Sequence, residues 1–225
     1  MFSLDLTPLA ASFFSLLAIA SLLLTFVMLG SHWLFNYLLA FALQSWLIAL
    51  LSATVGYYGH YPELMLIAIL TALFRGLLIP YLILRIVSRL NVDRELHPAL
   101  APSSALVLGS LAVIFAFVVA THIGTALTLT SVSVMALTIM LSMKLIGFLM
   151  LVIRHEAISM VLGLLVLENG IFLGSQLLIP GMPLLIEMVV LFDLLVIVVS
   201  FGVLVRLLVA HVGSTDSRDL KRLVG

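Results

Sequence analysis

The chain has 225 residues, of which 64% are hydrophobic and 9% are charged, and its ten basic and ten acidic side chains give a formal net charge of zero. Its mean hydropathy of +1.36 lies far above that of a soluble domain, and no basic tract is dense enough for a nucleic-acid interface. The absence of cysteine excludes thiolate-ligated iron–sulfur clusters, thiolate zinc sites, disulfides and cysteine nucleophiles. We therefore expect an all-α, polytopic membrane protein that binds no nucleic acid.

Charges, glycines and prolines divide the chain into about seven apolar runs, each close to the 20 residues that a spanning helix needs. The first run is expected to be a retained span, because the segment before it carries Asp5 and no Lys or Arg of a signal peptide. The weakest break lies at Gly30 to His32, and it is inferred because one helix over 8–56 would be too long for a single crossing. The expected spans are 8–30, 33–56, 63–88, 103–122, 131–153, 157–179 and 184–209.

The clearest break is the polar loop at 89–102 (RLNVDRELHPALAP), which mixes four charges with an asparagine and two prolines. This loop separates the first three expected spans from the rest of the chain. We expect an N-terminal three-span region with its cytoplasmic loop at 1–102, a fourth span with an outer loop at 103–130, and a three-span module with a cytoplasmic tail at 131–225.

The positive charges outside the spans predict the orientation, because Lys and Arg in short loops stay on the cytoplasmic side. With seven spans, all of them fall on one side of the membrane. This asymmetry predicts an N-terminus outside and a C-terminus in the cytoplasm. The residues concerned are Arg85, Arg89, Arg94, Arg154, Arg206, Arg218, Lys221 and Arg222.

Most charges lie at or beyond the ends of the expected spans, but five ionisable side chains lie deeper: Arg75, Lys144, Glu168, Asp193 and, less deeply, Glu187. An ionised group at mid-membrane costs about 2.5–3.5 kcal/mol on insertion scales, and such groups commonly mark ion pathways. The alternative is that they only lock helices together.

The rise of an α-helix per residue allows the acids and the lysine to be ranked by their depth in the membrane. Lys144 lies ten residues before Arg154, and Glu168 lies twelve residues after Glu156. At about 1.5 Å per residue, Lys144 and Glu168 differ in depth by only a few Å. Asp193 and Glu187 follow toward the outer side, so the series forms a candidate proton path.

Two further features, a stripe of small residues in the sixth span and a proline in the third, bear on the helices that carry these charges. Small residues at Ser159, Gly163, Gly170 and Gly174 form a stripe that predicts close approach of another helix, most simply as ordinary packing. In the third span, Pro80 cannot donate a hydrogen bond to the carbonyl four residues before it. We therefore expect a kink or local unwinding one turn beyond Arg75.

No motif predicts catalysis or a bound cofactor in this chain. The six histidines fall in expected loops or near span ends, so paired haem ligands at one depth are not expected, and no metal-binding pair is evident. No phosphate-binding loop, nucleophile elbow or zinc-protease motif occurs. We expect a non-catalytic subunit with neither metal nor cofactor.

The stretch 151–169, LVIRHEAISMVLGLLVLEN, resembles the small three-span subunit K of respiratory complex I. The register of that family's glutamate falls on Leu165, whereas the glutamate of this chain is Glu168, one helical turn later on the same face. In the following span, Asp193 takes about the place of the family's second buried acid, and Glu187 is additional. The matching residues are Leu151, Val152, Ile153, Arg154, Met160, Gly163 and Asn169.

A module of this kind preceded by four spans resembles component E of hydrogenase-4. The resemblance rests on Glu168–Asn169 in span six, Glu187 and Asp193 in span seven, a basic residue shortly before a proline in span three, and a short polar tail. It implies a multi-pass subunit of a complex-I-like energy-converting hydrogenase in the cell inner (cytoplasmic) membrane. The implied partners are antiporter-like subunits and quinone- or hydrogenase-module subunits, which would hold the iron–sulfur and nickel centres.

The leading hypothesis is therefore a proton-conducting subunit of an oxidoreductase complex. Glu168 and Asp193 would be protonated and released, Lys144 would relay or tune, and Arg75 would polarise its neighbours. Two alternatives stay open: a subunit of a multi-subunit Na⁺/H⁺ antiporter, and a purely structural membrane subunit.

Overall fold

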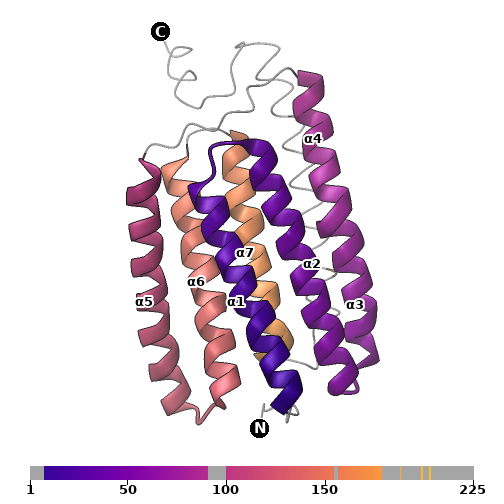
Figure 1. Ribbon diagram of the computed structural model, residues 1–225, viewed down its shortest axis with the longest axis vertical. Helices are drawn as coiled ribbons and strands as arrows, with labels where there is room; N and C mark the ends of the chain where they lie inside the picture. Colours follow the sequence, from indigo (N-terminus) through magenta and orange to yellow (C-terminus); the bar gives the residue numbers. More distant parts are fainter. Residues whose placement is uncertain are drawn as a thin grey trace.

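A computed structural model describes residues 8–90, 100–154 and 157–178 of the chain, together with Met188, Val199 and Val203 singly. Within these residues, six helices are long and apolar enough to cross a membrane (Figure 1). The described part is a helical bundle, and the chain is a multi-pass membrane protein by the length and composition of these helices. The span expected at 184–209 lies outside the described residues.

The described helices follow the expected spans closely. They are α1 (Pro8–Gly30), α2 (Leu34–Tyr58), α3 (Pro62–Leu73), the π-helix η1 (Phe74–Leu78), α4 (Ile79–Leu90), α5 (Pro102–Ala126), α6 (Ser131–Ile153) and α7 (Ala157–Leu178). The third span consists of α3, η1 and α4 in one continuous path.

The break expected between the first two spans is confirmed. The helical path stops after Gly30 and resumes at Leu34, with Trp33 in an extended conformation. The hydroxyl of Ser31 donates to the carbonyl of Trp33 across this turn, at 3.1 Å. Three residues are therefore enough to reverse the chain.

α5 ends four residues later than expected. The expected end is 122, but the hydroxyls of Thr121 and Thr125 donate to carbonyls about one turn back in the same helix. These bonds satisfy the polar groups within the helix, so the helix continues until the turn at Thr128, where φ is +50°.

The helices run alternately up and down through the bundle (Figure 1). α1, α4 and α6 end at one end of the bundle, which we call the Gly30 end, and α2, α5 and α7 end at the other, the Tyr58 end. α5 lies at the edge of the bundle and contacts α1 and α6.

α6 and α7 approach each other most closely through their glycines, which confirms the predicted small-residue stripe. A Cβ atom on Gly147 would lie 2.9 Å from the carbonyl oxygen of Gly163, and one on Gly170 would lie 2.8 Å from Cβ of Met143. Gly174 similarly faces Met140. The stripe is thus a packing face that sets the relative depth of the two helices.

The apolar interior is divided into two clusters, one toward each end of the bundle. The Gly30-end cluster is centred on Met28, Leu34, Tyr37, Phe41, Ile83, Met150 and Leu162. The Tyr58-end cluster is centred on Phe14, Ile48, Leu51, Leu64, Ile139, Met143 and Phe172. Five spans (α1, α2, α3–α4, α6 and α7) contribute to both clusters, and polar side chains lie where they pass from one to the other.

Candidate functional site

A set of fully buried polar side chains lies between the two apolar clusters, near the middle of the spans. On α2, for example, Gln44 and Ser45 separate Phe41 of the Gly30-end cluster from Ile48 of the Tyr58-end cluster. We call this set the middle layer. It consists of Ser21 and Thr25 on α1, Gln44 and Ser45 on α2, Arg75 on η1, and Asn169 on α7.

Asn169 joins three helices of the middle layer. Its Oδ1 accepts a hydrogen bond from Nη1 of Arg75 at 2.7 Å. Its Nδ2 donates to Oε1 of Gln44 at 3.0 Å and lies 3.5 Å from the Ser45 hydroxyl. One side-chain amide thus uses both its acceptor and its donor to hold η1 and α2 against α7.

Gln44 extends the same hydrogen-bonded set to α1. Its Nε2 donates to the carbonyl of Ser21 and to Oγ1 of Thr25, each at 2.8 Å. Both amide hydrogens and the amide oxygen of Gln44 are therefore occupied. A buried polar group without such partners would be destabilising by about 1–3 kcal/mol, so these bonds make the layer compatible with a membrane interior.

Arg75 is fully buried and lies in the π-helical turn. The amide of Ile79 donates to the carbonyl of Phe74, five residues back, where an α-helix would bond four residues back. This local unwinding beside Pro80 confirms the predicted irregularity, and π-turns of this kind are frequent at functional sites. The guanidinium carbon of Arg75 lies 5.0 Å from the ring centroid of Phe172, within the range of a cation–π contact.

Lys144 and Glu168 lie at the level of the middle layer, and both are partly buried. On α6, Lys144 falls between Met143 of one apolar cluster and Ile146 of the other. A Cβ atom on Gly170 would lie 3.4 Å from the backbone nitrogen of Lys144, so Glu168 and Lys144 are close in depth, as predicted.

The two acids expected on the last span, Glu187 and Asp193, fall outside the residues that the structure describes. Of the five predicted site residues, the structure therefore gathers Arg75, Lys144 and Glu168 at one depth. Arg75 donates a hydrogen bond directly to Asn169, the residue that follows Glu168 in the chain.

Arg154 was expected in a loop at the cytoplasmic end of the fifth span, and the structure adds that this side chain is buried. It directly follows α6, but it is only 1% exposed. Its Nη2 donates to the carbonyl of Met28 at 3.1 Å and of Ser31 at 3.2 Å, and its guanidinium carbon lies 5.5 Å from the centroid of the Tyr37 ring. It thus adds a side-chain donor to carbonyls at the end of α1, where an α-helix lacks its regular backbone donors.

The amide side chains of the middle layer were missed because only ionisable groups were counted as costly in the membrane. A usable signal exists, since the chain has only two glutamines, Gln44 and Gln176, and both lie within apolar spans. Amide and hydroxyl side chains within spans commonly form hydrogen bonds between helices.

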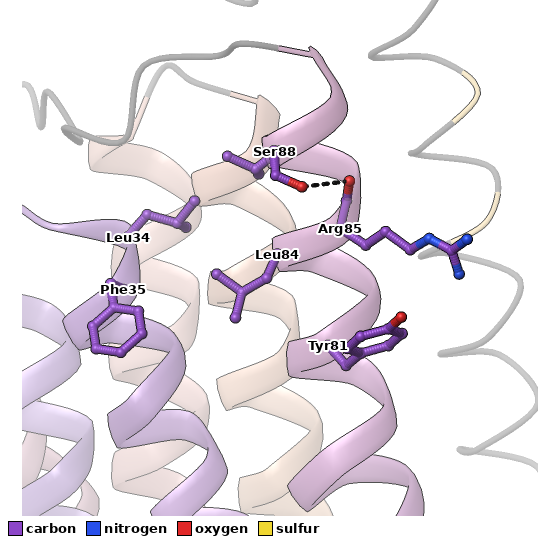
Figure 2. Close-up of a pocket in the computed structure, with 7 residues that line it drawn as sticks. Leu34, Phe35, Tyr81, Leu84, Arg85 and Ser88 are labelled. Carbon is purple, nitrogen blue, oxygen red and sulfur yellow. Dashed lines mark hydrogen bonds between the residues drawn. The ribbon is translucent and has the colours of Figure 1, made fainter.

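A groove of about 420 Å³ lies outside the middle layer, between the start of α2 and the end of α4 (Figure 2). Its walls are mostly apolar, and Arg85 is the only charged side chain among the described residues that line it. Its lining consists of Leu34, Phe35, Tyr81, Leu84, Arg85, Val87 and Ser88.

Comparison with known proteins yields a distant similarity. The chain is 28% identical over 161 residues to an uncharacterised protein, Rv0085, of Mycobacterium tuberculosis (strain ATCC 25618 / H37Rv), and the match covers 71% of this chain and 72% of the relative. No protein-family model matches the chain, and no solved structure matches it. Among the described residues, no group of three or more histidine, aspartate or glutamate side chains could hold a metal ion.

Proposed function

We propose that this protein is a non-catalytic membrane subunit of a complex-I-like energy-converting hydrogenase, or of a related redox complex, in the cell inner membrane. Its middle layer and the adjacent Glu168 and Lys144 would contribute to proton translocation. In the proposed topology the chain has seven spans, the seventh at 184–209, with its N-terminus outside and its C-terminus in the cytoplasm. Its partners would be antiporter-like subunits and the subunits that carry the redox centres.

The observation that carries the proposal is the coincidence in depth of the middle layer with Arg75, Lys144 and Glu168. Two apolar clusters isolate this level from both ends of the bundle. Ionisable groups are costly there, so their concentration at one depth favours an ion-handling role over scattered helix contacts. Glu168 and Lys144 would exchange protons, because carboxyl and ammonium groups can gain and lose them. The amides of the middle layer would only orient these groups through hydrogen bonds.

The positive charge of Arg75 gives the site a fixed electrostatic element. A guanidinium is not deprotonated in proteins, so it stabilises negative charge on carboxylates at the same level. Asn169 holds this guanidinium from α7, beside Glu168 in the chain. A shift of α7 relative to η1 would change the field at Glu168, and movements of partner subunits could cause such a shift.

The test is proton translocation by the assembled complex carrying Glu168→Gln, Lys144→Met or Asp193→Asn. We expect each variant to retain redox turnover and to lose a large part of the protons moved per turnover. Glu63→Gln is the matched control, because Glu63 is an exposed carboxylate in the first turn of α3, away from the middle layer. Unchanged translocation in the combined Glu168 and Asp193 variants would contradict the proposal.

The composition of the native complex tests the partner assignment independently. Gentle purification should recover this chain with a hydrogenase-like large subunit. Recovery with antiporter subunits and no redox subunit would point instead to Na⁺/H⁺ antiport. If Glu168→Gln and Glu168→Asp both prevent assembly, a purely structural role would replace the proposed one.

A further inference from the structure

A second polar pair lies within the Tyr58-end cluster, on the same two helices that meet at Asn169. Nε2 of Gln176 on α7 donates to the hydroxyl of Ser52 on α2 at 2.6 Å, and both residues are fully buried. Gln176 lies seven residues beyond Asn169, and Ser52 lies seven residues beyond Ser45. The α2–α7 contact therefore repeats its polar pair after two helical turns, about 10 Å nearer the Tyr58 end.

The hydrogen bonds around this pair fix the orientation of the Gln176 amide. The Ser52 hydroxyl donates its hydrogen to the carbonyl of Ile48 at 3.0 Å, so it can only accept from Gln176. The amide nitrogen of Gln176 must then face Ser52. Oε1 of Gln176 is buried, and no hydrogen-bond donor reaches it from the residues that the structure describes.

A buried acceptor without a protein donor is destabilising, and ordered water usually satisfies it. The pair also lies close to the Tyr58 end of the bundle. Ser52 lies six residues before the end of α2 at Tyr58, which corresponds to about 9 Å of helix. Gln176 lies two residues before Leu178, where the described part of α7 stops.

On the opposite side, the pair is separated from the middle layer by apolar side chains. Ile48 on α2 and Phe172 on α7 are both fully buried between the two polar levels. The ring of Phe172 also contacts the guanidinium of Arg75. The Ser52–Gln176 pair is therefore a separate polar position between the middle layer and the Tyr58 end.

We propose that Oε1 of Gln176 binds a water molecule between α2 and α7, and that this water is a station on the proton route from the middle layer to the Tyr58 end. The second half of this inference rests on the proposed function, whereas the water site stands without it. Phe172 and Ile48 would close the route between the two polar levels in the conformation described.

The water site can be tested on the unaltered full-length chain, because its only two glutamines are Gln44 and Gln176. Isotopic labelling of glutamine alone gives two side-chain amide signals, and Gln44 is an internal control whose amide groups all have protein partners. Solid-state NMR in lipid bilayers should show rapid magnetisation transfer from water to the Gln176 amide and much slower transfer to Gln44. Equally slow transfer to both amides would overturn the water site.

The role in proton movement is tested by Gln176→Met in the assembled complex, with Leu173→Met as the matched control. Both residues are fully buried on α7, but only Gln176 offers a polar atom to water. We expect a several-fold loss of protons moved per redox turnover for Gln176→Met and no loss for Leu173→Met. If Glu168→Gln abolishes translocation while Gln176→Met leaves it unchanged, the station is wrong and the proposed function stands. If neither variant affects translocation, the proposed function and the station are both wrong, and the NMR comparison still decides the water site.

Discussion

Nη1 of Arg75 and Oδ1 of Asn169 lie 2.7 Å apart, although 94 residues separate them in the chain. The bond ties the irregular turn of the third span to the middle of α7. Because Asn169 also donates to Gln44, a change at this amide is felt by three helices at once. The middle layer is thus both a structural junction and the setting of the ionisable side chains.

The first prediction concerns this amide. Asn169→Leu should lower the free energy of unfolding by about 1–3 kcal/mol, because it leaves polar groups of Arg75 and Gln44 buried without their partner. Asn169→Asp keeps an acceptor for Arg75 and loses only the donor to Gln44, so it should be less harmful. Unfolding in mixed detergent micelles measures both, and equal stability of Asn169→Leu and the parent chain would contradict the layer's structural role.

The second prediction concerns the contact between α6 and α7. Gly147→Ala should destabilise the protein by about 1–3 kcal/mol through overpacking, because the new Cβ atom would meet backbone atoms of α7 at 2.9 Å. Gly30→Ala is the control, since its nearest neighbour would be a leucine side chain at 3.7 Å. Thermal unfolding followed by tryptophan fluorescence should separate the two variants, and similar melting curves would argue against the close approach.

A third prediction concerns the hydrogen bonds from Arg154 to carbonyls at the end of α1. Arg154→Met should cost about 1–3 kcal/mol, because the carbonyl of Ser31 loses the Arg154 donor and that of Met28 keeps only the 3.3 Å bond from the Ser31 amide. Hydrogen exchange of backbone amides at 31–34 should accelerate in the variant. Arg85→Met removes an exposed arginine near the same end of the bundle and should leave both measurements unchanged. Slow exchange at 31–34 in Arg154→Met would show that the turn holds without this side chain.

A fourth prediction concerns the groove between α2 and α4. Its walls suit an acyl chain, and Arg85 at its edge favours an anionic head group, which basic residues near a membrane surface attract. Native mass spectrometry should show that Arg85→Gln retains fewer anionic phospholipids, while retention of zwitterionic ones is unchanged. Arg85→Lys keeps the charge and should behave as the parent chain. Loss of both lipid classes would mean that charge is not what selects them.

The positions of the six described spans were predictable, because bilayer thickness dictates their length and almost any apolar run of that length satisfies it. The irregular turn near Arg75 was predictable for a different reason. Pro80 lacks an amide hydrogen, and that covalent fact acts locally whatever the rest of the chain does. The small-residue stripe of α7 likewise predicted a close contact with another helix, because only small residues allow two helix backbones to approach closely.

The partner of Arg75 was not predictable from the sequence. The spans are apolar on nearly every side, so the apolar pattern does not indicate which face of each helix turns inward. The meeting of Arg75 with Asn169 depends on the rotation and depth of two helices far apart in the chain. Arg154 shows the same difficulty, since its position after α6 indicated a boundary charge, whereas its burial depends on where α1 ends.

The hydrogen bond between Arg75 and Asn169 also has a consequence for biogenesis. Synthesis proceeds from the N-terminus, so Arg75 is added to the chain 94 residues before Asn169. During that interval its guanidinium must be sheltered by the insertion machinery or by a protein already in the membrane. A nascent chain interrupted before α7 would expose an arginine without its amide partner to lipid, and membrane proteases and chaperones could recognise it as unfinished.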